Sequence, residues 1–135
     1  MHLQLGSWRD RHRVTRTSLG LVLLAACAAP AAIPPHLTLH WTSAPAAGRD
    51  SIAEIQLNDA MARPVTGARL QLEAFMAHPG MAPVGAAVDE QGNGRYVARV
   101  RFTMAGDWVV RVQGSRADGG AIDVQENVRS VRPAE

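Results

Sequence analysis

Methionine and histidine side chains gather in one short stretch of the chain. Met76, His78 and Met81 surround the turn-forming pair Pro79-Gly80, and Met104 follows just before a glycine. Thioether sulfur and neutral imidazole suit Cu(I), a soft ion that roughly two to four such ligands satisfy. A turn at Pro79-Gly80 would let His78 and Met81 face one ion, with Met76 two residues back on the same side of an extended strand. We therefore predict Met76, His78, Met81 and Met104 as Cu(I) ligands.

The same residues also have a purely structural interpretation. Methionine fills irregular gaps in protein cores, and Met104 follows Phe102 by two positions, in phase with a buried strand face. Met76, next to Phe75, would then cap the core, and His78 would be an ordinary loop residue. The alternative hypothesis is a metal-free structural or protein-interaction module of the cell envelope. In that module the sulfurs are buried and apart, and a sheet face or edge binds the partner.

The elements that must position these residues are predicted to be β-strands. Apolar and polar residues alternate over most of the chain after residue 36, as expected of strands with one buried face. Turn-forming runs such as Asn58-Asp59, Gly92-Asn93-Gly94 and Asp118-Gly119-Gly120 separate them. The pattern predicts an all-β fold, a small immunoglobulin-like antiparallel β-sandwich of about seven strands. The alternating stretches are residues 37–42, 53–57, 68–74, 96–102, 108–112 and 121–131.

The N-terminus has the layout of a bacterial export signal. Residues 1–16 are polar and positively charged, and residues 19–29 are apolar. The apolar run is too short for a membrane-spanning helix, which needs about 20 residues. Leu24-Ala25-Ala26-Cys27 resembles the lipobox of bacterial lipoproteins, whose cysteine becomes the acylated first residue of the mature chain. The predicted organisation is a lipoprotein signal peptide at 1–26, an Ala/Pro tether at 27–35 and a β-sandwich domain at 36–135.

Lipidation at Cys27 would anchor the domain to a bacterial membrane, because several acyl chains together bind firmly where one does not. Cys27 is the only cysteine in the chain, so no intramolecular disulfide is possible. Ala28 lacks the acidic character that typically retains such proteins in the inner membrane. The predicted location is therefore extracytoplasmic, on the periplasmic side, with the outer membrane favoured.

Charge and motif content argue against two classes of function. Four of the fourteen Arg precede the apolar run, and from Cys27 onward ten Arg stand against eleven Asp and Glu. A nucleic-acid-binding domain is expected to carry a basic patch, so no nucleic-acid partner is predicted. The chain also lacks a Gly-x-Ser-x-Gly nucleophile turn, a His-Glu-x-x-His zinc motif and a phosphate-binding glycine loop. We therefore predict a protein that is not an enzyme.

Three segments of the predicted strands resemble a known family. They are Arg63-Pro64-Val65-Thr66-Gly67-Ala68, Gly94-Arg95-Tyr96-Val97-Ala98 and Phe102-Thr103-Met104-Ala105-Gly106-Asp107-Trp108. Over roughly residues 50 to 114 they resemble the YtkA-like domain and its relative, the FixH family. The resemblance gives Met104 the place of a methionine of the family pattern. FixH-type proteins usually have an N-terminal membrane helix and assist assembly of a copper-containing oxidase, whereas this chain has a lipobox.

Together these features predict a membrane-anchored extracytoplasmic binding protein. Its expected role is that of a Cu(I) carrier or an accessory in metalloenzyme assembly, holding the ion weakly enough to pass it on. Besides the membrane, the expected partner is an envelope protein or a copper enzyme.

Overall fold

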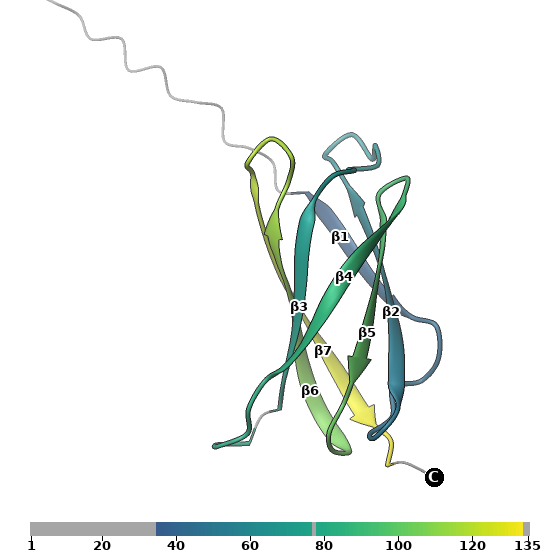
Figure 1. The fold of residues 1–135 in the computed structure, drawn as a ribbon, viewed down its shortest axis with the longest axis vertical. Helices are drawn as coiled ribbons and strands as arrows, with labels where there is room; N and C mark the ends of the chain where they lie inside the picture. Colours follow the sequence, from purple (N-terminus) through teal and green to yellow (C-terminus); the bar gives the residue numbers. More distant parts are fainter. Residues whose placement is uncertain (1–34, 77, 134–135) are drawn as a thin grey trace, which may run out of the picture. The chain divides into compact units, whose positions relative to one another are not determined.

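The computed structural model describes residues 35–76 and 78–133, which form seven β-strands (Figure 1). No helix occurs within these two ranges, and the all-β prediction is confirmed. The strands are β1 (His36–Trp41), β2 (Asp50–Asn58), β3 (Arg69–Met76), β4 (Val84–Gly92), β5 (Arg95–Arg101), β6 (Gly106–Ser115) and β7 (Ala121–Val131).

The predicted signal peptide, Cys27 and the tether up to residue 34 lie outside the described residues. Among the residues that are described, no helix is long and apolar enough to span a membrane.

The strands pair in the order β1-β2-β5-β4-β3-β6-β7, and every neighbouring pair is antiparallel. One layer contains β1, β2 and β5, and the other contains β3, β6 and β7. Strand β4 passes between the layers, because residues 84–87 pair with β3 while residues 88–92 pair with β5. In Figure 1, β4 crosses obliquely between β3 and β5. This arrangement is the predicted immunoglobulin-like sandwich.

A second contact joins the two layers near the end of β7. Ala46 forms an isolated parallel bridge with Arg132. The Ala47 amide donates to the Arg132 carbonyl at 2.8 Å, and the Arg132 amide donates to the Pro45 carbonyl at 3.0 Å. Strands β1 and β7 do not pair with each other. The segment that follows β1 instead forms backbone hydrogen bonds with Arg132, just after β7.

The core consists of the inward-facing residues of both layers, as the two-residue period of the sequence predicts. Trp108, Tyr96 and Phe102 are the largest fully buried side chains. Phe102 lies between two tryptophans, with ring centroids 5.3 Å from Trp108 and 5.6 Å from Trp41. Each buried large apolar side chain stabilises the fold by about 1.5–3 kcal/mol relative to an exposed one. All members of the core cluster lie between residues 53 and 131, so the domain contains its own complete core.

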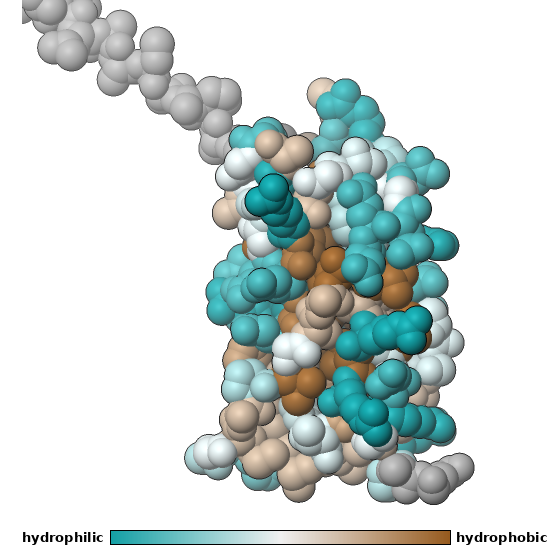
Figure 2. Space-filling view, in the orientation of Figure 1, coloured by the Kyte–Doolittle hydropathy of each residue, from teal (hydrophilic) through white to brown (hydrophobic). Residues whose placement is uncertain are grey.

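Strand β4 is the element that the alternating pattern does not reveal. Its first half contains Gly85, Ala86 and Ala87, whose small side chains carry little strand preference. Val84, Ala86 and Val88 are nevertheless half-buried and pack against the core. Figure 2 shows hydrophobic residues along the middle of the face that β4 crosses, flanked by hydrophilic ones. The position of β4 is therefore set by pairing with β3 and β5 rather than by its own sequence.

A buried tyrosine fixes the connection between β2 and β3. The Tyr96 hydroxyl donates to the Val65 carbonyl at 2.9 Å and accepts from the Ala68 amide at 3.1 Å. The Glu90 carboxylate accepts from the Gly67 amide at 3.0 Å. These bonds tie the connection before β3 to strands β4 and β5 at the end of the sandwich opposite Met76.

Candidate metal site

The four predicted Cu(I) ligands lie at one end of the sandwich, one at the end of a strand and three on two connections. Met76 is the last residue of β3, His78 and Met81 lie in the β3–β4 connection, and Met104 lies in the β5–β6 connection. Because Met76 is the register partner of Trp108, the end of β3 lies beside the start of β6. Both connections therefore emerge at the same end, the lower one in Figure 1. We call the four residues the methionine end.

A turn at Pro79-Gly80 forms as predicted. Gly80 has a φ of 85°, and the Met81 amide donates to the His78 carbonyl at 3.5 Å. A positive φ suits glycine because it has no Cβ. Strand β3 ends at Met76, so the expectation that an extended strand carries Met76 and His78 on one side is wrong. The turn brings His78 and Met81 close along the backbone, and both side chains are exposed.

The β5–β6 connection is held in place by bonds to the core and to β7. The buried Trp108 indole nitrogen donates to the Met104 carbonyl at 3.1 Å. The Asp107 carboxylate accepts from the Ser130 amide at 2.9 Å, beside a register shift between β6 and β7. The Met104 residue is 49% exposed. The interpretation of Met104 as a core residue is therefore wrong, because the alternation of β5 ends before it.

Met76 differs from the other three residues because it is half-buried and packs against the core. Its Cε atom would lie 2.8 Å from a Cβ at Gly106. Its side chain thus reaches from the end of β3 to the first residue of β6, two residues from Met104. Met76 therefore joins the end of β3 to the start of β6, the two strand ends from which the candidate ligands' connections lead.

Two of the three exposed methionines in the described ranges lie at this end of the sandwich. The only large hydrophobic residues that are exposed in the described ranges are Met61 at 76%, Met104 at 49% and Met81 at 39%. Met61 lies in the β2–β3 connection, at the opposite end, and is solvent-exposed as its position in a turn suggests. Among the described residues, no three His, Cys, Asp or Glu side chains come together as a metal site.

Two further residues at this end were not identified as functional from the sequence. Gly106 accommodates the Met76 methyl group, and Trp108 bonds the Met104 carbonyl. Their spacing relative to Met104 was visible in the sequence as Met-x-Gly-x-Trp. That spacing alone does not reveal which carbonyl the indole meets, or which side chain lies against the glycine.

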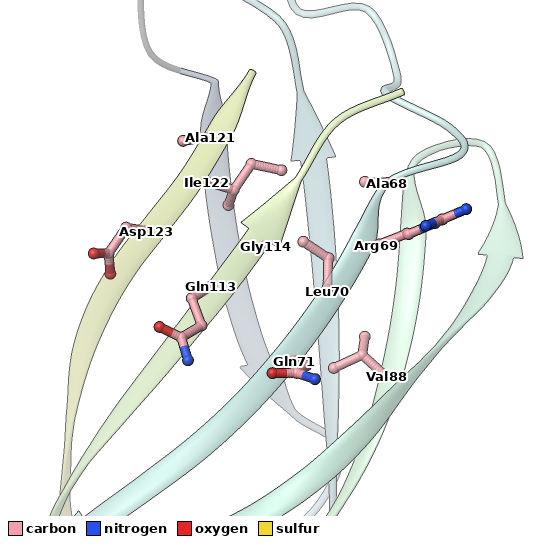
Figure 3. Close-up of a pocket in the computed structure, with 10 residues that line it drawn as sticks. All are labelled: Ala68, Arg69, Leu70, Gln71, Val88, Gln113, Gly114, Ala121, Ile122 and Asp123. Carbon is pink, nitrogen blue, oxygen red and sulfur yellow. The ribbon is translucent and has the colours of Figure 1, made fainter. Parts of the chain in front are cut away.

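A separate groove of about 660 Å³ lies in the opposite half of the sandwich. It lies over the first residues of β3 and β7 and the last of β6. Figure 3 shows Leu70 and Ile122 on either side of Gly114, with the amides of Gln71 and Gln113 nearby. Its lining contains no methionine or histidine, so this groove does not involve the predicted ligands.

Shifted pKa values occur along β7, away from the methionine end. A hydrogen bond from Arg111, 2.7 Å from Nε to Oδ1, lowers the pKa of the Asp123 carboxyl. Partial burial raises the pKa of Glu126. Glu126 is the register partner of the buried Val110, so it lies on the inward-facing side of β7, where its side chain is only partly covered. The ionised form is therefore favoured at Asp123 and disfavoured at Glu126, so protonation of the two carboxyls by acid has opposite effects on stability.

Comparison with known proteins supports the fold and identifies a family. Residues 36–113 match the family model described as YtkA-like. The filamin domain of Lin-41 has a similar structure, with a TM-score of 0.52, 15% sequence identity and coverage of 74% of this chain and 98% of that one. Murine CRIg has a TM-score of 0.41 and 13% identity over 74% of this chain and 99% of that one. No curated protein has significant sequence similarity to the chain.

Proposed function

Since the chain belongs to the YtkA-like family, we propose that it is a lipid-anchored extracytoplasmic module that carries Cu(I) at its methionine end. The family and the immunoglobulin-like fold fit an extracytoplasmic module and are not typical of enzymes. The copper function itself is our inference from the side chains at one end of the sandwich.

The observation that carries this proposal is the exposure of thioethers at that end. Large apolar side chains gain free energy by being buried, yet Met81 and Met104 remain exposed on two connections that emerge together. The exposed imidazole of His78 lies on the same connection as Met81. The metal-free alternative expects buried, separated sulfurs, and these two are neither buried nor at different ends.

The donor set suits Cu(I) and a carrier function. Thioether and imidazole ligands favour this soft ion over magnesium or calcium, which prefer oxygen. Outside the cytoplasm thiols tend to oxidise or form disulfides, and the chain has no cysteine after Cys27. Neutral ligands on exposed connections would leave the ion accessible to an acceptor. The acceptor in this proposal is an envelope protein, such as a copper enzyme under assembly.

Export and anchoring complete the proposed function. Cys27 would carry the lipid, and the eight residues from Ala28 to Pro35 would separate the anchor from β1. A Cys27→Ala variant expressed in a bacterial host should move from the membrane fraction to the soluble periplasmic fraction and lose incorporation of labelled fatty acid. Retention of the label by the variant would contradict lipidation at this residue.

A competition titration with a chromogenic Cu(I) chelator tests the metal site. The chain from Ala28 onward is suitable, because it contains the whole core cluster. We expect the parent to take one Cu(I) and the His78→Ala, Met81→Ala double variant to lose at least about tenfold in affinity, since two of its few soft ligands are gone. Met61→Ala, at the opposite end, is the matched control and should bind as the parent does.

The competing function predicts a different result in the same titration. If the parent and the double variant compete equally poorly, the copper carrier is ruled out and the metal-free interaction module becomes the better interpretation. A pull-down of envelope proteins with the lipidated chain is then the appropriate next experiment.

A further inference from the structure

One buried residue, Trp108, is directly related to two of the three methionines at the methionine end. Trp108 bonds the backbone of Met104 and is the register partner of Met76. We propose that Trp108 is the positioning residue of the Cu(I) site, holding the thioether of Met76 on β3 and that of Met104 on the β5–β6 connection in a fixed relation. This inference rests on the proposed function, and it assigns a role that core packing alone does not require.

The hydrogen bond to Met104 is the first observation. Trp108 is 1% exposed, and its indole nitrogen donates to the Met104 carbonyl at 3.1 Å. A buried indole N–H needs an acceptor. Here the acceptor is the backbone carbonyl of Met104, whose thioether side chain is exposed. Met104 is thus tied to the core through its backbone, while its side chain remains free to bind.

The register with Met76 is the second observation. Directly opposite residues on an antiparallel pair share one face, with Cβ atoms about 4.5–5.5 Å apart. Met76 and Trp108 are such a pair, so the indole and the half-buried thioether are neighbours on the inner face. The Met76 methyl group extends further to Gly106. Trp108 therefore pairs with Met76 on β3 and bonds Met104 on the β5–β6 connection.

The packing of the indole makes it a rigid support. Its ring meets Phe102 edge to face with centroids 5.3 Å apart, and Phe102 packs on Trp41 with centroids 5.6 Å apart. Groups that are ordered before binding lose less conformational entropy when the ligand arrives. Because Trp108 restrains the Met104 connection in advance, loss of its N–H should weaken Cu(I) binding while leaving the ligands themselves intact.

A pair of conservative variants tests this role. Trp108→Phe keeps an aromatic ring but removes the N–H donor. Trp41→Phe is the matched control, because Trp41 belongs to the same aromatic cluster and its side chain does not bond Met104. In the chelator titration we expect Trp108→Phe to bind Cu(I) about 3- to 10-fold more weakly, corresponding to one neutral hydrogen bond. Trp41→Phe should stay within about twofold of the parent.

Fluorescence supplies a readout that leaves Trp108 in place. The chain from Ala28 onward contains two tryptophans, Trp41 and Trp108, so the Trp41→Phe variant emits from Trp108 alone. Saturating Cu(I) should change that emission, whereas the Trp41 emission of Trp108→Phe should change much less. If circular dichroism shows that Trp108→Phe unfolds, the Trp108 emission of Trp41→Phe can still overturn the proposal, because the positioning role requires that emission to respond to Cu(I).

The outcomes separate the two proposals. Weaker binding in Trp108→Phe together with a response of Trp108 emission supports the positioning role. Equal affinities of the two variants, or Trp108 emission that does not respond at saturation, overturn it while the parent's copper binding stands. If the parent binds no Cu(I), the proposed function fails and the positioning role fails with it.

Discussion

The methyl group of Met76 occupies the space that a side chain at Gly106 would need. A Cβ atom at Gly106 would lie 2.8 Å from Met76 Cε, and the glycine has a φ of 131°. Real Cβ atoms essentially never approach a heavy atom so closely, so the Met76 side chain would have to move. This contact couples the start of β6 to the end of β3.

The first prediction follows from this contact. Gly106→Ala should weaken Cu(I) binding several-fold, because the added Cβ displaces the Met76 thioether. The variant should also lose about 1–3 kcal/mol of stability from backbone strain. Gly119→Ala is the matched control, since Gly119 has a φ of 86° and no heavy atom lies within 4 Å of the position that a Cβ would take there. Gly119→Ala should lose stability while its Cu(I) affinity, measured in the same chelator titration, stays at the parental value.

The second prediction concerns the exposed thioethers. Met104→Leu should lower Cu(I) affinity by about tenfold, since one soft ligand is removed, with little change in the thermal midpoint. Met61→Leu, a change of the same kind at the opposite end, should alter neither property. Calorimetry and the chelator titration measure the two quantities. If Met61→Leu weakens binding as much as Met104→Leu, binding is not confined to the methionine end.

The third prediction concerns the tyrosine that fixes the β2–β3 connection. Tyr96→Phe leaves the Val65 carbonyl and the Ala68 amide without their partner, which should destabilise the domain by about 1–3 kcal/mol. Denaturant unfolding of the chain from Ala28 onward measures the loss. Cu(I) affinity of the folded variant should be unchanged, because these bonds lie at the end of the sandwich away from the candidate ligands; a parallel loss of affinity would show that the two ends are coupled.

The same tyrosine should make stability depend on alkaline pH. Burial raises the pKa of Tyr96 above its usual value of 10.0. A raised pKa in the folded state means that stability is fully present below pH of about 10 and is lost as pH rises through the folded-state pKa. The decline of the unfolding free energy above that pH should be shallower in Tyr96→Phe than in the parent.

The last prediction uses the two carboxyls of β7 at acidic pH. The lowered pKa of Asp123 means that its contribution is present above the usual value of 3.8 and is lost as pH falls through the lower folded-state pKa. Glu126 has a raised pKa, so its contribution is present below 4.5 and is lost as pH rises. Glu126→Gln should therefore raise the thermal midpoint slightly at pH 7, whereas Asp123→Asn should lower it.

Calorimetry across pH checks the opposite signs of these two substitutions. The advantage of Glu126→Gln should shrink as pH falls through the raised folded-state pKa and should be absent below about 4.5, where the glutamate is neutral in both the folded and the unfolded state. The deficit of Asp123→Asn should shrink below about 3.8 for the same reason. A Glu126→Gln variant that is less stable than the parent at pH 7 would falsify the inference that burial penalises the ionised carboxyl.

Much of the fold was predictable because successive residues of a half-buried β-strand alternate between apolar and polar side chains. The alternation in residues 68–74 and 96–102 corresponds to β3 and β5, and Asp118-Gly119-Gly120 does form the turn before β7. Strand β4 was not predicted from alternation, because Gly85, Ala86 and Ala87 are all small and do not distinguish an apolar face from a polar one. Its existence depends on hydrogen bonds to β3 and β5, which lie in other parts of the sheet.

The candidate site was predictable in its residue types but not in its geometry. A Pro-Gly turn is a local feature, so the sequence alone predicted the turn at Pro79-Gly80 that the structure contains. The ligand role of the flanking His78 and Met81 stays a prediction from their residue types. The exposure of Met104 was not determined by its phase with Phe102, because alternation holds only while a strand continues, and β5 ends at Arg101. The contact of Gly106 with Met76 and the pairing of Met76 with Trp108 join segments about 30 residues apart, and only the tertiary structure decides them.

By itself, then, the sequence determined which side chains face inward along most strands, where the chain turns at several positions, and which methionine and histidine side chains the domain contains. The tertiary structure decided that two connections emerge at one end, that Met76 lies against Gly106, and that Trp108 holds the Met104 carbonyl. The physical reason is the sequence distance over which each interaction acts. Alternation and turn preference act between residues a few positions apart, whereas strand order and register arise from pairing and packing across the whole domain.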